Sequence, residues 1–150
     1  MATIEDLDSL VSFINGSFLD ENPHLIRGRS DTEEIAHLLE IGHFLLIEEE
    51  GQIAGSIYAE IRGDGRGYLG LLAVSPERRR SGMGRRLIRA GEQFCREQGC
   101  RLIEGNVVNL RPDLLERYQR YGFRVVGEVP GVLRDRVDRD YNLILLEKDL

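Results

Sequence analysis

Apolar residues recur at helical spacing in two stretches near the start of the chain. In the first stretch they run from residue 7 to residue 18, after Thr3, which can cap the helix together with Asp6. A second helix is predicted to start at Ser30, where Glu33 completes a capping box. The chain is therefore expected to open with two helices.

Two further helices are predicted later in the chain. One follows the glycines at positions 82 and 84, carries an apolar face, and ends near Gly99. The other starts at Pro112, which suits the first helical position, and stops at Gly122. Its apolar face includes Leu114, Leu115, Tyr118 and Tyr121.

The remaining apolar stretches are short and typical of strands. In one of them, alternate residues from Ile53 to Ile61 are predicted to share one face, and Asp64-Gly65 then predicts a hairpin turn. Helices and strands interleave in both hairpin and crossover order, which predicts a single domain over residues 1–150 of the α/β class with a mixed sheet. The predicted strands are 44–48, 53–61, 68–74, 102–108, 123–128 and 141–147.

Composition narrows the classes of protein. The chain has 150 residues, 41% of them hydrophobic and 31% charged, which is typical of a globular domain. No apolar run could span a bilayer and none follows a basic N-terminus, so we expect a cytoplasmic protein without membrane attachment. A formal charge of −6 argues against a nucleic-acid binder.

Cysteine and histidine give no sign of a metal site. Cys95 and Cys100 are five residues apart, outside the spacing of metal-binding pairs, and the three histidines are scattered. Cys95 falls on the apolar face of its helix and is expected to pack there, whereas Cys100 could be a reactive thiol. We predict no metal.

The segment "SPERRRSGMGRRL" (75–87) carries the clearest chemistry. It joins a predicted strand to a predicted helix, an arrangement that presents free backbone N–H groups to phosphate. Gly82 and Gly84 let a ligand approach the backbone, and the arginines at 78–80 can add charged contacts to phosphate oxygens. A dinucleotide fingerprint and a Walker loop are both excluded, because Leu87 replaces the third glycine and Gly-Lys-Ser/Thr is absent. On these residues alone, a surface turn with solvated arginines stays open.

The longer segment "LLAVSPERRRSGMGRRLI" resembles the acetyl-CoA-binding segment of the GCN5-related N-acetyltransferase (GNAT) superfamily. The family signature, Arg/Gln-x-x-Gly-x-Gly/Ala, is matched by Arg79, Gly82 and Gly84. A "Y-x-x-x-G-F" ending at the fourth helix, from Tyr118 to Phe123, is also similar to the family. The resemblance implies a mostly antiparallel sheet flanked by about four helices, whose first strand is missing or very short here.

The resemblance also implies acetyl-CoA as co-substrate and a direct transfer to an amine. Loop amides would hold the pyrophosphate, and the exposed backbone of the preceding strand would pair with the pantetheine arm. The residues implied for the loop are Arg79, Arg80, Ser81, Gly82, Met83 and Gly84, and those implied for the strand are Leu72, Ala73 and Val74.

Tyr118 matches the family position of the acid that protonates the departing thiolate. It also shares a helix face with apolar residues, so packing is the alternative, and packing is what we expect for Tyr121.

Three candidates remain for the general base that accepts the proton of the amine: two carboxylates and a water molecule. Glu104 lies five residues before Asn109, as in relatives whose asparagine contacts CoA, and is the first choice. Counting back from Tyr118 instead places Asn106 at the glutamate position and Arg111 at the asparagine position. Glu60 is the second choice, and a water relay the third.

Sequence does not name the acceptor. We expect a small-molecule amine, for which Arg27 and Arg29 could bind a carboxylate, and a protein that is a monomer or homodimer. The alternatives are acetylation of a peptide or protein amine, and a non-catalytic module that binds acyl-CoA.

Overall fold

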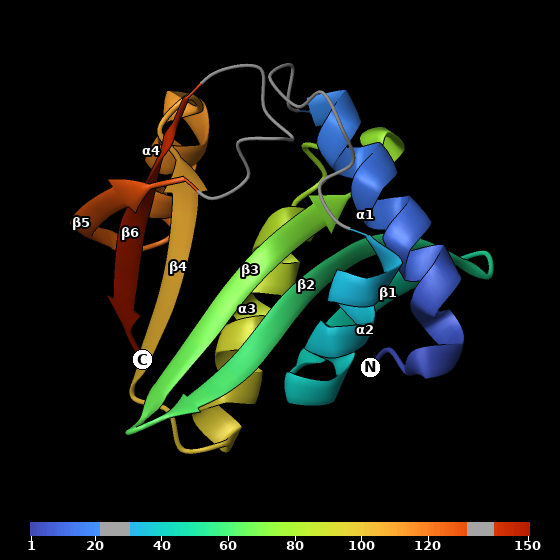
Figure 1. The fold of residues 1–150 in the computed structure, drawn as a ribbon, viewed down its shortest axis with the longest axis horizontal. Helices are drawn as coiled ribbons and strands as arrows, with labels where there is room; N and C mark the ends of the chain where they lie inside the picture. The colour runs from blue at the N-terminus through green and yellow to red at the C-terminus, as the bar shows by residue number, and fades with distance from the viewer. Residues whose placement is uncertain (22–30, 132–139) are drawn as a thin grey trace.

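The computed structural model describes residues 1–21, 31–131 and 140–150, which form one six-stranded sheet with helices on both faces (Figure 1). The strand order is β1-β2-β3-β4-β6-β5, and all neighbours are antiparallel except β3 and β4. The strands are β1 (His43–Glu49), β2 (Gln52–Gly63), β3 (Arg66–Val74), β4 (Leu102–Val108), β5 (Arg124–Pro130) and β6 (Asn142–Asp149). The α-helices are α1 (Leu7–Glu21), α2 (Thr32–Ile41), α3 (Met83–Glu97) and α4 (Pro112–Arg120).

The predicted fold class is confirmed, because the mixed and mostly antiparallel sheet and its four α-helices all occur in the described residues. Two local predictions are wrong. The helix α2 is capped by Asp31, whose side chain accepts a hydrogen bond from the Glu34 amide at 2.8 Å; Ser30 lies outside the described residues. The face predicted for alternate residues of β2 does not include Ile53, which packs with the cluster under α1 and α2, whereas Ile57 and Ala59 belong to the cluster under α3. The pairing of β2 with β1 shifts register between Gly55 and Ile53, which reverses the alternation there.

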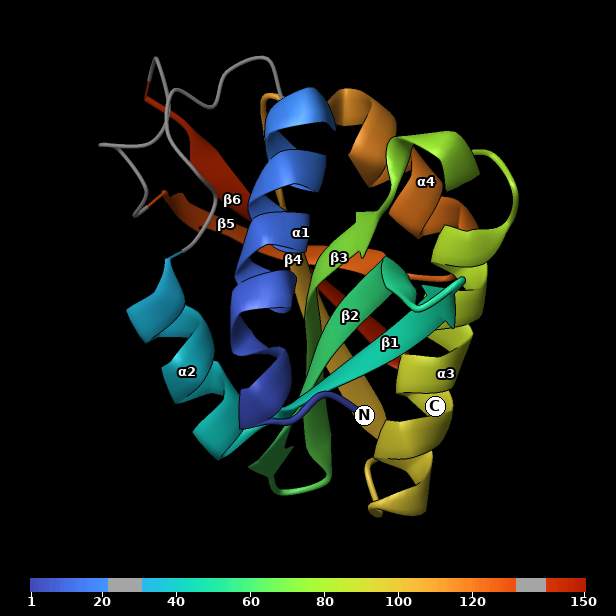
Figure 2. The same cartoon turned by 90° about the vertical axis from the view of Figure 1, so that its right-hand side faces the viewer.

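Two layers of helices enclose the sheet (Figure 2). The helices α1 and α2 cover one face, where Leu10, Ile14 and Tyr58 are among the buried residues. The helix α3 covers the other face, where its own Leu87 and Ile103 of β4 are among the buried residues, and side chains of α4 pack against the same cluster. No helix within the described ranges has the length and apolar character needed to cross a membrane.

The sheet splits between β3 and β4. These parallel strands pair only from Arg66 to Tyr68, opposite Leu102 to Glu104, and then diverge (Figure 1). Beyond Tyr68, the edge of β3 therefore has no partner strand on the β4 side within the described part of the chain. An unpaired strand edge offers N–H and C=O groups to a ligand.

A bulge lies in β3 beside the split. Pairing with β2 passes from Tyr58 opposite Gly70 to Ser56 opposite Ala73, so β3 has one extra residue. Leu71 lies in this bulge and takes a left-handed conformation with φ +49°. The bulge bends β3 at the point where it leaves β4.

The expectation of a missing first strand is confirmed for the described residues, since the 3₁₀ helix η1 (Ile4–Asp6) and α1 come before any strand. Ala2 makes one backbone hydrogen bond to Phe44 of β1, at 2.9 Å. As expected from that absence, β1 lies at the sheet edge.

Candidate functional site

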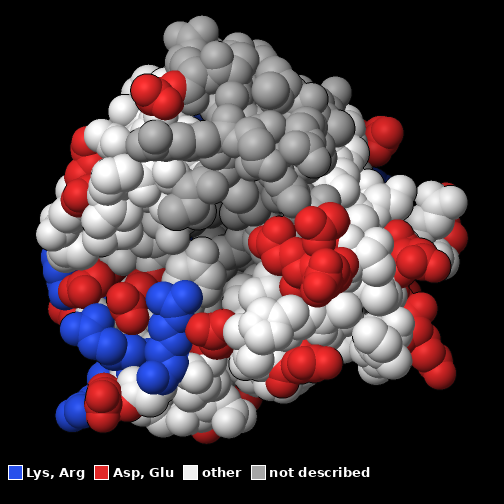
Figure 3. Space-filling model, viewed as in Figure 1, with Lys and Arg blue, Asp and Glu red and all other residues white. Residues whose placement is uncertain are grey.

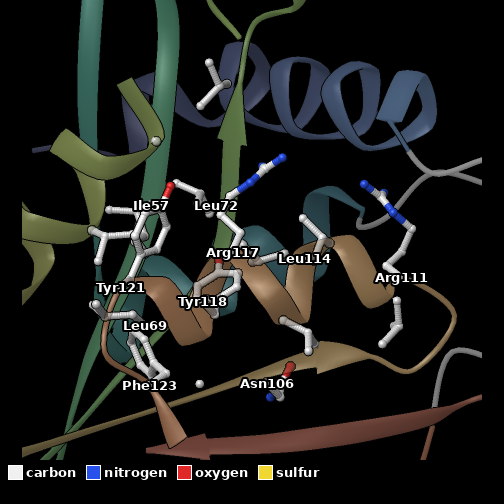
Figure 4. A pocket seen from close by; sticks show the side chains of 18 of the residues that line it. Ile57, Leu69, Leu72, Asn106, Arg111, Leu114, Arg117, Tyr118, Tyr121 and Phe123 are labelled. Carbon is white, nitrogen blue, oxygen red and sulfur yellow. The ribbon is translucent and has the colours of Figure 1, made fainter. Parts of the chain in front are cut away.

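A cavity of about 630 Å³ occupies the split between β3 and β4 (Figure 4). Its walls come from both strands, from the start of α3 and from α4. Leu114, Arg117 and Tyr118 project from α4, Tyr121 follows that helix directly, and Asn106 comes from β4. The cavity therefore joins the strand edge to the loop that the sequence singled out.

The loop from β3 to α3 leaves backbone amides at the cavity. After the 3₁₀ helix η2 (Pro76–Arg78), Arg80 and Gly82 adopt left-handed conformations, with φ +66° and +86°. The first hydrogen bond of α3 runs from the Arg86 amide to the Gly82 carbonyl at 3.1 Å. The amides from Gly82 to Arg85 precede that bond, so they form the donor-rich and electropositive end of a helix.

The two loop glycines leave room that a ligand could fill. A Cβ on Gly82 would meet no atom within 4 Å, and a Cβ on Gly84 would lie 3.9 Å from Leu72 and 4.0 Å from Val74. Neither glycine is therefore required by close packing within the protein, although φ +86° favours glycine at position 82. Open space at a helix N-terminus fits a phosphate group.

The arginines of the loop differ in their surroundings. Arg79 lines the cavity and donates a hydrogen bond from Nη2 to the Ser17 carbonyl of α1 at 3.0 Å. Arg78 pairs with Glu49 of β1 at 2.7 Å, and Arg80 lines the cavity with an exposed side chain. Arg85, in the first turn of α3, also lines the cavity, with its guanidinium 5.9 Å from the centre of the Tyr121 ring.

The predicted cofactor residues divide into two groups. Ala73 and Met83 are buried away from the cavity, and the Ser81 hydroxyl donates to the Arg78 carbonyl. Those that line the cavity are Leu72, Val74, Arg79, Arg80, Gly82 and Gly84.

Tyr118 lines the cavity as a half-buried side chain. Its ring meets Tyr121 and Phe123 edge to face, with centroid distances of 5.9 and 5.6 Å. Tyr121 lines the cavity as well, although the sequence predicted only packing for it. The two tyrosines place hydroxyl groups on the α4 side of the split.

Neither predicted base lines the cavity. A Glu104 carboxylate oxygen lies 3.7 Å from Arg66 Nη1, where β3 and β4 are still paired. Acidic and basic side chains interleave at this end of the sheet, at the lower left of Figure 3, and Arg66 also contacts Glu147 at 3.2 Å. Glu104 thus belongs to a surface ion-pair network.

Glu60 is held by two donors on the α1 and α2 side of the sheet. The Tyr58 hydroxyl donates to Glu60 at 2.6 Å, and Arg62 Nε donates to its other oxygen at 2.8 Å. Burial acts to raise the pKa of Glu60, but the hydrogen bonds from Tyr58 and Arg62 outweigh it and hold that pKa below its ordinary value. A carboxylate held in this way is a weak base.

The two ways of aligning β4 with the family give different cavity residues. Counting back from Tyr118, which selects Asn106 and Arg111, agrees with the cavity lining better than the spacing between Glu104 and Asn109 does. Asn109 does not line the cavity; its side chain accepts a hydrogen bond from the Asn142 amide at 2.8 Å. Arg111 and Asn106 line the cavity instead, and Arg111 also pairs with Asp113 at 2.8 Å. The remaining cavity residues that sequence reasoning missed include Glu34, Tyr68 and Arg117. Arg27 and Arg29 lie outside the described residues.

The cysteines are buried and lie together, Cys95 on α3 and Cys100 just after it, against Gly67 of β3. A Cβ on Gly67 would meet both sulfur atoms, Cys95 Sγ at 2.8 Å and Cys100 Sγ at 3.3 Å. Burial, with smaller contributions from Cys100, raises the pKa of Cys95 to about 12. Within the described ranges no three His, Cys, Asp or Glu side chains are grouped as metal ligands.

Comparison with known proteins gives one family and one named relative. The sequence profile described as "Acetyltransferase (GNAT) family" matches residues 5–123. The mycothiol acetyltransferase of Propionibacterium freudenreichii subsp. shermanii is 29% identical over 136 residues, which cover 85% of this chain. The chain spans 43% of that relative's length.

Solved structures share the fold. The ribosomal-protein-alanine N-acetyltransferase of Brucella melitensis superposes with a TM-score of 0.77 at 22% identity, covering 99% of this chain and 97% of its own. An acetyltransferase of Elizabethkingia anophelis with acetyl-CoA bound gives 0.72 at 19% identity, covering 85% and 89%.

Proposed function

The chain belongs to the GNAT family of acetyltransferases, and from this premise we propose that it is an N-acetyltransferase that transfers the acetyl group of acetyl-CoA directly to a small-molecule amine. The observation that carries the proposal is the pair of glycines at the start of α3, which leave open space beside the unpaired edge of β3. We assign residues 1–150 to one catalytic domain.

In this proposal the amides from Gly82 to Arg85 bind the pyrophosphate, because they precede the first hydrogen bond of α3. Arg80, which lines the cavity, adds positive charge there. The edge of β3 near Leu72 and Val74 binds the pantetheine arm through its backbone.

Acetyl-CoA would supply a thioester, whose carbonyl carbon forms a bond with the amine nitrogen as the carbon–sulfur bond breaks. Tyr118 donates its phenolic proton to the departing sulfur. Of the three bases considered from the sequence, water is the one retained for the proton lost by the amine, because neither Glu104 nor Glu60 lines the cavity.

The first experiment is calorimetric titration with CoA and acetyl-CoA. Gly84→Leu would fill the space beside Leu72 and Val74 and should weaken binding by about tenfold or more. Gly16→Leu is the matched control, because Gly16 is exposed on α1 and a Cβ there meets nothing within 4 Å. Wild-type protein that binds no CoA at millimolar concentration would overturn the proposal.

The second experiment measures thiol release from acetyl-CoA with a panel of primary amines and alanine-terminated peptides. Preference for a small amine supports the proposal, as does the name of the relative, mycothiol acetyltransferase, which names a thiol compound rather than a protein. Preference for the peptides would assign the chain to peptide acetylation. Tight CoA binding with no thiol release from any acceptor would instead support a non-catalytic module.

A further inference from the structure

Two polar side chains meet where β3 and β4 separate. Tyr68 belongs to the last paired position of β3, and Asn106 lies two residues beyond that position on β4. Both line the cavity and both are half-buried (Figure 4 labels Asn106). Asn106 Nδ2 donates a hydrogen bond to the Tyr68 hydroxyl at 3.4 Å, which bridges the two strands across the start of the split.

The Tyr68 ring is fixed from several sides. The Arg62 guanidinium lies 4.1 Å from the ring centre, and Arg62 is itself held by Glu60 at 2.8 Å. Tyr58 meets the ring edge to face at 6.3 Å between centroids. Gly70 makes room for the hydroxyl, because a Cβ there would lie 2.5 Å from Tyr68 Oη.

Asn106 and Tyr68 both have hydrogen-bond acceptor positions that no described residue uses. In the described part of the chain, Asn106 Oδ1 accepts no hydrogen bond, and the Tyr68 oxygen accepts only one, from Asn106. A carboxamide oxygen and a phenolic oxygen each offer lone pairs to an N–H group. Two acceptors side by side suit a group that carries two N–H bonds.

We propose that Tyr68 and Asn106 bind the amino group of the acceptor and select primary amines. Each oxygen accepts one N–H, which leaves the nitrogen lone pair free for attack. A secondary amine has only one N–H and loses one of the two bonds. This inference rests on the proposed function, since it assumes that the acceptor enters at the β3 and β4 split.

The probe is a pair of CoA derivatives that need no knowledge of the natural acceptor. S-(carboxamidomethyl)-CoA carries an NH₂ group just beyond the acyl position, and S-acetonyl-CoA carries a methyl group in its place. Wild-type protein should bind the carboxamide about thirtyfold more tightly, the worth of two ordinary hydrogen bonds of about 1 kcal/mol each. Calorimetric titration measures both constants.

Tyr68→Phe and Asn106→Leu each remove one acceptor, so each should reduce this preference to about fivefold, while the affinity for S-acetonyl-CoA stays unchanged. Tyr58→Phe is the matched control: its hydroxyl contacts Glu60 outside the cavity, so the preference should persist. A loss of folding alone would change both affinities together and leave their ratio intact.

The outcomes separate the two proposals. If neither derivative binds wild-type protein, the proposed function fails. If both bind equally well, or if the preference stays undiminished in Tyr68→Phe and Asn106→Leu, the assignment of these two residues is overturned while CoA binding stands.

Discussion

Gly70→Ala tests the contact that positions Tyr68. Gly70 does not require glycine for its backbone, because its φ is not among the positive values. The added Cβ would lie 2.5 Å from Tyr68 Oη and 2.7 Å from Cε1, roughly 1 Å closer than ordinary contact. The ring must therefore move.

The cost follows from what the ring loses when it moves. The bond from Asn106 contributes about 1 kcal/mol, and the stacked Arg62 contributes about 0.5–1 kcal/mol at a partly exposed site. The half-buried ring can turn toward the cavity, so we expect no large overpacking strain. Replacing glycine with alanine also stabilises the fold by about 0.4–1 kcal/mol, because alanine lowers the conformational entropy of the unfolded chain. The net expected destabilisation is about 1 kcal/mol.

A double-mutant cycle isolates the contact. In a Tyr68→Ala background nothing remains for the Cβ to displace, so Gly70→Ala should stabilise the protein by about 0.5 kcal/mol. Urea denaturation of the four proteins should therefore give a coupling energy near 1.5 kcal/mol, and Gly70→Ala alone should lower Tm by about 2–4 °C. An equal effect of Gly70→Ala in both backgrounds would refute the reasoning.

Three further variants test the site and its surroundings. Tyr118→Phe should lower kcat by about 10²-fold or more in a thiol-release assay, with the Kd of CoA within twofold of wild type; an unchanged kcat removes Tyr118 from the chemistry. Glu104→Gln should change kcat by less than about threefold, because Arg66 holds this side chain outside the cavity; a loss of tenfold or more would restore Glu104 as the base. Burial acts to raise the pKa of Glu60, but the hydrogen bonds to its carboxylate outweigh burial and lower that pKa below the ordinary value of 4.5. The ionised Glu60 therefore stabilises the fold above pH 4.5, and this stabilisation is lost as the pH falls below that value. Glu60→Gln should therefore make the unfolding free energy less dependent on pH in acid, and equal pH slopes for the two proteins would contradict this.

Local sequence signals were sufficient for most of the fold. The helix α4 begins at Pro112 and its last turn is followed by Gly122 with φ +100°, as the sequence predicted, because these residues act within one turn. The alternation in β2 was less informative. Residues Ala54 to Ala59 are all buried, since helices cover both faces of this central strand, and the period of two is lost.

Within the site, the cavity residues of β4 were harder to predict than the glycine loop. Gly82 and Gly84 could be found because their spacing and the following helix are local features. Glu104 and Asn106 share a strand face, so strand periodicity could not choose between them. What separates them is the length of pairing with β3, which ends opposite Glu104 and leaves Asn106 in the cavity. That limit depends on contacts between distant segments.

The bulge at Leu71 switches the face of the sheet on which the even-numbered residues of β3 lie. Leu69, Leu72 and Val74 all belong to the cluster under α3, and a regular strand could not place residues 69 and 72 on one face. Tyr68 and Leu71 belong instead to the cluster under α1 and α2. The extra residue therefore reverses the alternation: before it, Tyr68 faces the side proposed for the acceptor, and after it, Leu72 and Val74 face the glycines proposed for CoA. No glycine marks position 71, so only the paired register of β2 and β3 reveals this switch.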